Sequence, residues 1–150
     1  MNFWSSMPYE RLRQWYDFRK SLTDKTLDSA VNEVQHLWSY APFVKYYLTT
    51  DMVDQWPNPW ELLYDNVYCD LAKALGIVYT LYLSDHKPDL EIRVYKDDEV
   101  KEYYNLVFVD KGKYVLNYQH DEVVNKKYIK NDLVLVKKFN SKDLRLDQLK

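Results

Sequence analysis

The spacing of apolar residues along this chain changes once, close to Gly76. Before Gly76, apolar residues recur every three or four positions, which is typical of helices that bury one face. After it, apolar and polar residues alternate, most clearly over 90–95, which is typical of half-buried strands. The pattern predicts an α+β fold in which three N-terminal helices precede a mainly antiparallel sheet of four to five strands.

Local start and stop signals place the expected elements. Helices are predicted from Pro8, from just after Asp24, and from Pro59 to about Leu75. The third has the clearest start, an Asn58 cap followed by proline, and Gly76 is expected to end it. Strands are predicted over 77–83, 90–95, 105–109, 114–118 and 133–136, with Gly112 in a hairpin loop.

Length and composition limit the possible classes of protein. The 150 residues suit a single domain, 1–150. Two glycines cannot form a glycine-rich phosphate loop, and one cysteine cannot form an intramolecular disulfide or a cysteine-based zinc cluster. No apolar stretch is long enough to span a membrane, and the first residues lack a secretory signal. We therefore expect a soluble protein that uses no cofactor and no metal.

Few residues suggest chemistry. Cys69 is predicted to lie inside the third helix, about seven residues before Gly76, and therefore to be a packing residue. His86 and His120 fall in predicted turns. Asp70 lies within the apolar face of that helix, where a bare carboxylate is costly, so it is a possible polar anchor at the core edge or, alternatively, a functional carboxylate. No catalytic residue is expected.

The C-terminal residues 125–150 hold eight basic and three acidic residues. Such a segment suits an acidic partner or a phosphate backbone, but it is more often a solvated edge. Because the whole chain has a net charge of −2, nucleic acid is an unlikely partner.

A stiff corner holds two tryptophans separated by two prolines. The corner residues Trp56, Pro57, Asn58 and Pro59 form a candidate partner-binding site, since tryptophan is enriched at interface hot spots. The alternative is a corner that docks the third helix on the core. In either case Trp60 is expected to be buried against the first two helices.

Two resemblances add to this interpretation. The corner from Trp56 to Leu63, with Tyr68–Asp70, 74–81 and 105–110, resembles a family of small uncharacterised proteins of T4-like tailed phages. That resemblance implies a phage origin and no established activity.

The chain also resembles transglutaminase-like cysteine hydrolases, in which a catalytic cysteine opens a helix and a histidine and an aspartate follow on strands. Counted back from Gly76-Ile77, the cysteine position falls near Leu62, the histidine position near Asn105 and the aspartate position near Asn117. The resemblance implies a degenerate version of that fold.

Three functions follow from these features. The first is a non-enzymatic virion structural or assembly protein that contacts other phage or host proteins, in the virion or the host cytoplasm. The second is a small host-directed or regulatory binding protein. The third is a cysteine hydrolase, which requires Cys69 to find a base.

Overall fold

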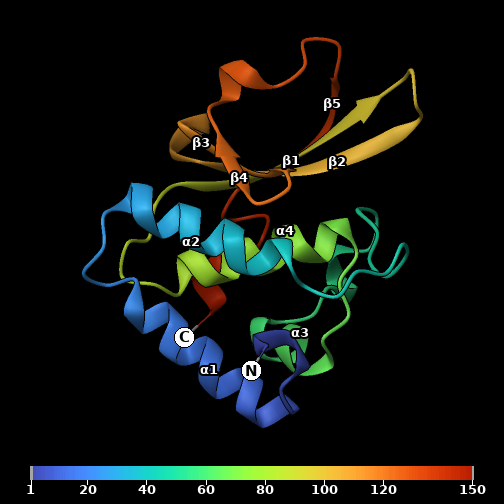
Figure 1. The fold of residues 1–150 in the computed structure, drawn as a ribbon. Coiled ribbons are helices and arrows are strands. Elements are labelled where there is room, and N and C mark those ends of the chain that lie inside the picture. The colour runs from blue at the N-terminus through green and yellow to red at the C-terminus, as the bar shows by residue number, and fades with distance from the viewer. Residues whose placement is uncertain (1, 150) are drawn as a thin grey trace.

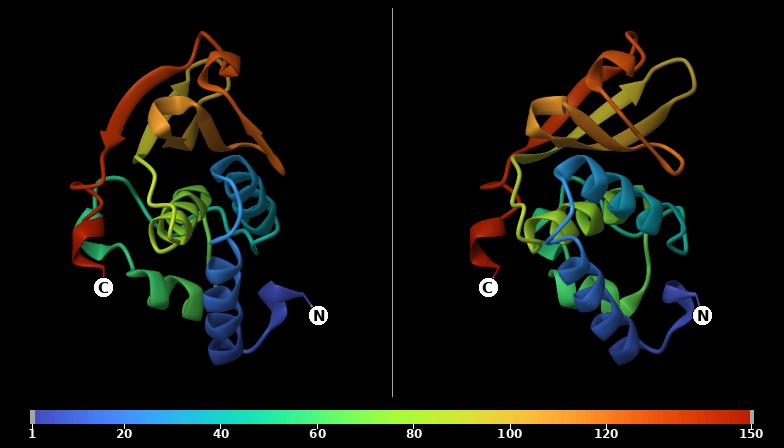
Figure 2. Two further views of the ribbon diagram at one scale, coloured as in Figure 1. Left: turned by 90° about the vertical axis from the view of Figure 1, so that its left-hand side faces the viewer. Right: turned by 60° about the vertical axis from the view of Figure 1, so that its left-hand side comes forward.

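The computed structural model describes residues 2–149 and has helices on one side of a single sheet (Figures 1 and 2). Helices α2 and α4 lie against the sheet, and α1 and α3 lie below them, farther from it (Figure 1). The predicted α+β class and the order of helices before sheet are confirmed. No helix among the described residues is both long and apolar enough to cross a membrane.

The first two helices lie close to their expected positions. Helix α1 covers Pro8–Ser21 and begins on a proline, and α2 covers Leu27–Ser39 with Thr26 as its side-chain cap. Helix α2 buries one face, which includes Val31, Val34 and Trp38. The apolar spacing therefore identified both helices correctly.

The expected third helix is in fact two helices. Helix α3 covers Pro59–Asp65 and begins in the capping box of Asn58 and Glu61. It ends at Asn66, whose φ of 57° is left-handed. Helix α4 then covers Asp70–Tyr82, so the strand predicted over 77–83 is wrong. A short run that is apolar throughout fits a buried strand and a buried helix equally well, and α4 is buried on nearly every side.

The sheet has five antiparallel strands in the order β4-β3-β2-β1-β5. Their bounds are β1 Leu90–Asp97, β2 Glu102–Val109, β3 Tyr114–Gln119, β4 Glu122–Val124 and β5 Val134–Phe139. The short strand β4 was not expected. Gly112 has a φ of 95° in the β2–β3 connection, as a left-handed loop position requires. The pairing Val107↔Leu116 sets the register in which β2 and β3 both face α4.

The double-tryptophan corner differs from expectation. Pro57 and Pro59 are buried, and Trp60 is 39% exposed instead of buried. Trp56 is half-buried: its Nε1 donates to the Thr49 carbonyl at 2.8 Å, and its ring meets the Phe139 ring edge-on. The expectation of a buried Trp60 is wrong because the first turn of α3 points this side chain outward. Partner binding by residues 56–59 stays a prediction.

The two tryptophans are expected to contribute unequally to stability. Trp56→Ala should cost about 3 kcal/mol because it removes a packed ring and a hydrogen bond, and Trp60→Ala about 1 kcal/mol. Urea denaturation of both variants measures the difference. A larger loss for Trp60→Ala would contradict this assignment.

Candidate active site

Cys69 lies at the N-terminus of α4, where it is the residue before the first helical position. The expectation that it lies inside a helix is wrong, because Asn66 ends α3 four residues before α4 begins. The thiol is 3% exposed and accepts a hydrogen bond from the Leu48 backbone N–H at 3.4 Å. None of the three histidines in the sequence hydrogen-bonds it among the described residues. Cys69 therefore has a favourable backbone position but lacks a base.

Asp70, the first residue of α4, is the centre of a polar cluster. Its Oδ2 accepts hydrogen bonds from the backbone N–H of Asn105 at 3.0 Å and from Asn105 Nδ2 at 2.9 Å. Its Oδ1 accepts from Asn117 Nδ2 at 3.3 Å. Asn117 Nδ2 also reaches the Asn105 carbonyl at 2.9 Å. Strands β2 and β3 thus bring two amides to one carboxyl group at the start of α4.

The positions implied by the transglutaminase resemblance can now be located. Asn105 on β2 and Asn117 on β3 lie together at the start of the helix that packs on the sheet. Leu62 does not join them, because it is a fully buried residue of α3. The count from Gly76 failed since Gly76 is in the middle of α4 and not at its end.

The environment of Asp70 alters its acidity. Burial raises the pKa of this carboxyl above its ordinary value, and the amide donors of Asn105 and Asn117 and the nearby Lys73 charge oppose the rise. Oδ2 already accepts two hydrogen bonds and Oδ1 accepts one, so Oδ1 keeps a lone pair for another donor. A carboxyl in this state can take up and release a proton at its Oδ1 atom.

A cavity of about 180 Å³ opens beside this carboxyl. It is lined by residues of α2, α4, the end of β3 and the loop after α2, namely Gln35, Ser39, Phe43, Asp70, Lys73, Asn117, Tyr118, Gln119 and His120. Cys69 is not among them. The cavity therefore presents Asp70, and not the thiol, to a ligand.

Residues of α2 hold the β3 side of the cavity in place. The backbone N–H of Asn117 donates to Gln35 Oε1 at 2.7 Å, and Gln35 Nε2 donates to Ser39 Oγ at 2.8 Å. Asn117 has a φ of 67°, a left-handed conformation that asparagine tolerates better than most residues. Its backbone is thus bound to α2 while its side chain reaches Asp70.

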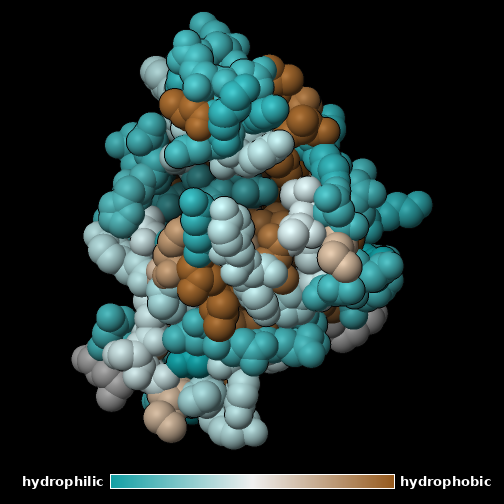
Figure 3. All heavy atoms as spheres, turned by 90° about the vertical axis from the view of Figure 1, so that its right-hand side faces the viewer, coloured by the Kyte–Doolittle hydropathy of each residue, from teal (hydrophilic) through white to brown (hydrophobic). Residues whose placement is uncertain are grey.

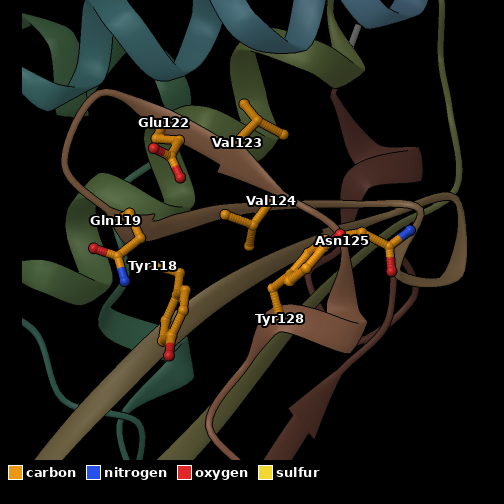
Figure 4. Close-up of a pocket in the computed structure, with 7 residues that line it drawn as sticks. All are labelled: Tyr118, Gln119, Glu122, Val123, Val124, Asn125 and Tyr128. Atoms are coloured by element: carbon orange, nitrogen blue, oxygen red, sulfur yellow. The ribbon is translucent and has the colours of Figure 1, made fainter.

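A second and larger cavity of about 390 Å³ lies between β3, β4 and the turn after β4. Figure 4 shows the Tyr118 and Tyr128 rings beside Val124 in this cavity. Tyr118 and Gln119 line both cavities, so the two cavities are adjacent. Glu122 is the only acidic residue that lines the larger cavity. This cavity offers fewer side chains that could take part in a reaction than the cavity beside Asp70 does. We therefore place the candidate active site at Asp70.

The fold has counterparts among solved protein structures. Solved structures of LapG from Legionella pneumophila are among those that are similar to it. The calcium-bound structure covers 91% of this chain and 78% of LapG, with a TM-score of 0.72 and 16% identity. The EGTA-treated structure covers 89% and 74%, with a TM-score of 0.71 and 16% identity. No family profile and no curated protein matches the sequence.

This likeness corrects the expectations about function. The interpretation as a non-enzymatic virion structural or assembly component is wrong, because the fold is shared with a protease. The likeness to LapG also contradicts the expectation that the protein is not an enzyme. No family profile supports the resemblance to phage proteins.

The calcium of LapG has no evident counterpart here. Among residues 2–149, no three His, Cys, Asp or Glu side chains lie close enough together to hold a metal ion. Calcium sites in proteins require several oxygen ligands, commonly carboxylates. The described residues therefore do not fit such a site.

Sequence reasoning identified part of the candidate site. The helical wheel drew attention to Asp70, and the resemblance pointed to Asn105 and Asn117. Sequence reasoning did not identify Lys73, Gln35 and Ser39 as residues that line the cavity. The one available signal was that Lys73 follows Asp70 by three positions, which places both on one helix face.

Proposed function

We propose that the protein is a hydrolase that acts on amide or ester carbonyls in the cavity beside Asp70. In this proposal Asp70, rather than a cysteine, is the catalytic residue. The observation that carries the proposal is a half-buried carboxyl group of raised pKa that lines a cavity and has one oxygen with a free lone pair. Titratable groups with perturbed pKa in a cavity are frequent at active sites.

Asp70 acts here as a general base. Its Oδ1 removes a proton from a water molecule, the water oxygen bonds to the substrate carbonyl carbon, and the proton then passes to the leaving nitrogen or oxygen as that bond breaks. Asn105 and Asn117 are positioning residues that fix the carboxyl. The first-turn N–H groups of α4, which Cys69 does not cap, provide positive potential for the carbonyl oxygen.

Two neighbouring substitutions test the proposal. The assay measures hydrolysis of p-nitrophenyl acetate by absorbance and of a tryptic peptide pool by mass spectrometry. Asp70→Asn should lower kcat/KM by at least about 100-fold, the usual lower value for loss of a general base. Cys69→Ala should keep the rate within about threefold, because the thiol does not line the cavity. Thermal denaturation of both variants monitors folding.

The pH dependence of the wild-type protein gives a second readout that needs no variant. Since the base works when deprotonated and its pKa is raised, kcat/KM should rise with pH through a midpoint above 3.8, the ordinary value for this carboxyl. Loss of activity in Cys69→Ala with retention in Asp70→Asn would contradict the proposal. So would the absence of hydrolysis of either substrate by the wild-type protein.

A further inference from the structure

Lys73 is a cation in the cavity without an anionic partner in contact. It lies one turn after Asp70 on α4 and lines the same cavity. Among residues 2–149, its Nζ atom makes no hydrogen bond and no ion pair within 4.0 Å. Its one close interaction is with the Phe43 ring, whose centroid is 5.5 Å away. The ammonium group thus lies at the cavity wall with no hydrogen bond to another described side chain or backbone group.

Lys73 and Asp70 are the two formally charged residues among those that line the cavity. Asp70 is the only acidic residue that lines the cavity, and its oxygens accept the amide donors of Asn105 and Asn117. The other lining residues are His120 and uncharged side chains. Burial lowers the pKa of Lys73 and Asp70 opposes this shift, which indicates an ammonium group that has lost part of its hydration.

The loop after α2, which carries Phe43 beside Lys73, exposes aromatic side chains. Figure 3 shows the face of the molecule that carries the loop after α2, where hydrophobic atoms gather beside polar ones. Phe43 and Tyr46 of this loop are 59% and 84% exposed. A chain that crosses this face could rest on the rings and direct one charged group to Lys73. Side-chain contacts of this kind suit an extended peptide better than a small metabolite.

We propose that Lys73 selects substrates that carry a carboxylate close to the reacting carbonyl. This inference adds a substrate class to the hydrolase proposed above, and it rests on that proposal. The carboxylate is supplied either by an acidic side chain of a peptide or by the free C-terminus of a peptide. Lys73 is a binding residue in this assignment and takes no part in proton transfer.

The test uses fluorescein-labelled Gly-Ala hexapeptides that hold one Glu or one Gln, each with an amidated or a free C-terminus. Binding is measured by fluorescence anisotropy with the Asp70→Asn protein, so that hydrolysis does not interfere. The wild-type protein provides kcat/KM. A carboxylate peptide should bind, and be hydrolysed, roughly tenfold better than its neutral counterpart, as expected for a hydrogen bond between charged groups. Comparison of the Glu and free C-terminus arms identifies the source of the carboxylate.

Lys45 provides a matched control, because its Nζ also lies 5.5 Å from an aromatic ring, that of Tyr46, but it does not line the cavity. Lys73→Met should abolish the preference for carboxylates, Lys73→Glu should reverse it, and Lys45→Met should leave it unchanged. Equal binding of charged and neutral peptides by the protein with Lys73 intact would overturn the inference.

The same experiment separates the two proposals. If Asp70→Asn abolishes hydrolysis but neither carboxylate arm is preferred, the substrate inference fails and the hydrolase stands. If a Lys73-dependent preference appears in binding and no peptide is hydrolysed, the ligand class is supported and the hydrolase fails. An equal loss of preference in Lys45→Met would also overturn the role of Lys73, since it would point to the general charge of this face.

Discussion

Replacement of Gly76 by alanine is expected to destabilise the protein by about 3 kcal/mol, although alanine is the better helix former. A Cβ atom at this position would lie 2.1 Å from Cη2 of Trp38 and 2.4 Å from two further atoms of the same ring. The ring cannot move aside easily because it is fully buried and meets Trp4 and Tyr68 edge-on. The clash therefore outweighs the gain of about 1 kcal/mol in helix propensity. Urea denaturation measures the loss.

A double-mutant cycle identifies the cause of this loss. In a Trp38→Leu background the clash is removed, so Gly76→Ala should there be neutral or stabilising by up to about 1 kcal/mol. The Trp38→Leu variant alone provides the reference. The same large loss in both backgrounds would show that Trp38 is not the obstacle.

The second large effect is expected for Thr80→Val. The Thr80 hydroxyl oxygen accepts the indole N–H groups of Trp15 and Trp38, each at 3.0 Å, and the hydroxyl donates to the Gly76 carbonyl at 2.6 Å. All of these side chains are fully buried. Valine has nearly the same shape but accepts nothing, so two buried N–H groups lose their partner at a total cost of about 2–4 kcal/mol.

Thr80→Ser is the matched control because it keeps the hydroxyl and removes only a methyl group. It should cost about 1 kcal/mol, the usual value for a small cavity. Thermal denaturation of both variants, with tryptophan fluorescence as the signal, measures the difference. If serine and valine cost the same, the hydroxyl contributes little and the network is not a stabilising feature.

The helices and the candidate site differed in how far local sequence could predict them. The Asn58 cap was predicted because it depends on neighbouring residues, and the capping box with Glu61 contains nothing from elsewhere in the chain. The break at Asn66 was not predicted, because Val67 and Leu71 continue the apolar spacing across it. As a result Cys69 and Asp70 were assigned to the middle of a helix that in fact begins with them.

The sequence by itself determined the α+β class, the order of helices before sheet and the loop in which Gly112 has a positive φ. Each of these depends on periodicity or on the conformational freedom of one residue. Only the tertiary structure decided that Ile77–Tyr82 is helical, because burial against Trp38 and the sheet and not local propensity selects between helix and strand in an apolar run. Only the tertiary structure joined Asp70 to Asn105 and Asn117, which are 35 and 47 positions away. Contacts between residues so far apart in the sequence produce no periodic pattern that sequence reasoning could detect. The candidate active site therefore forms only when β2 and β3 pack on α4.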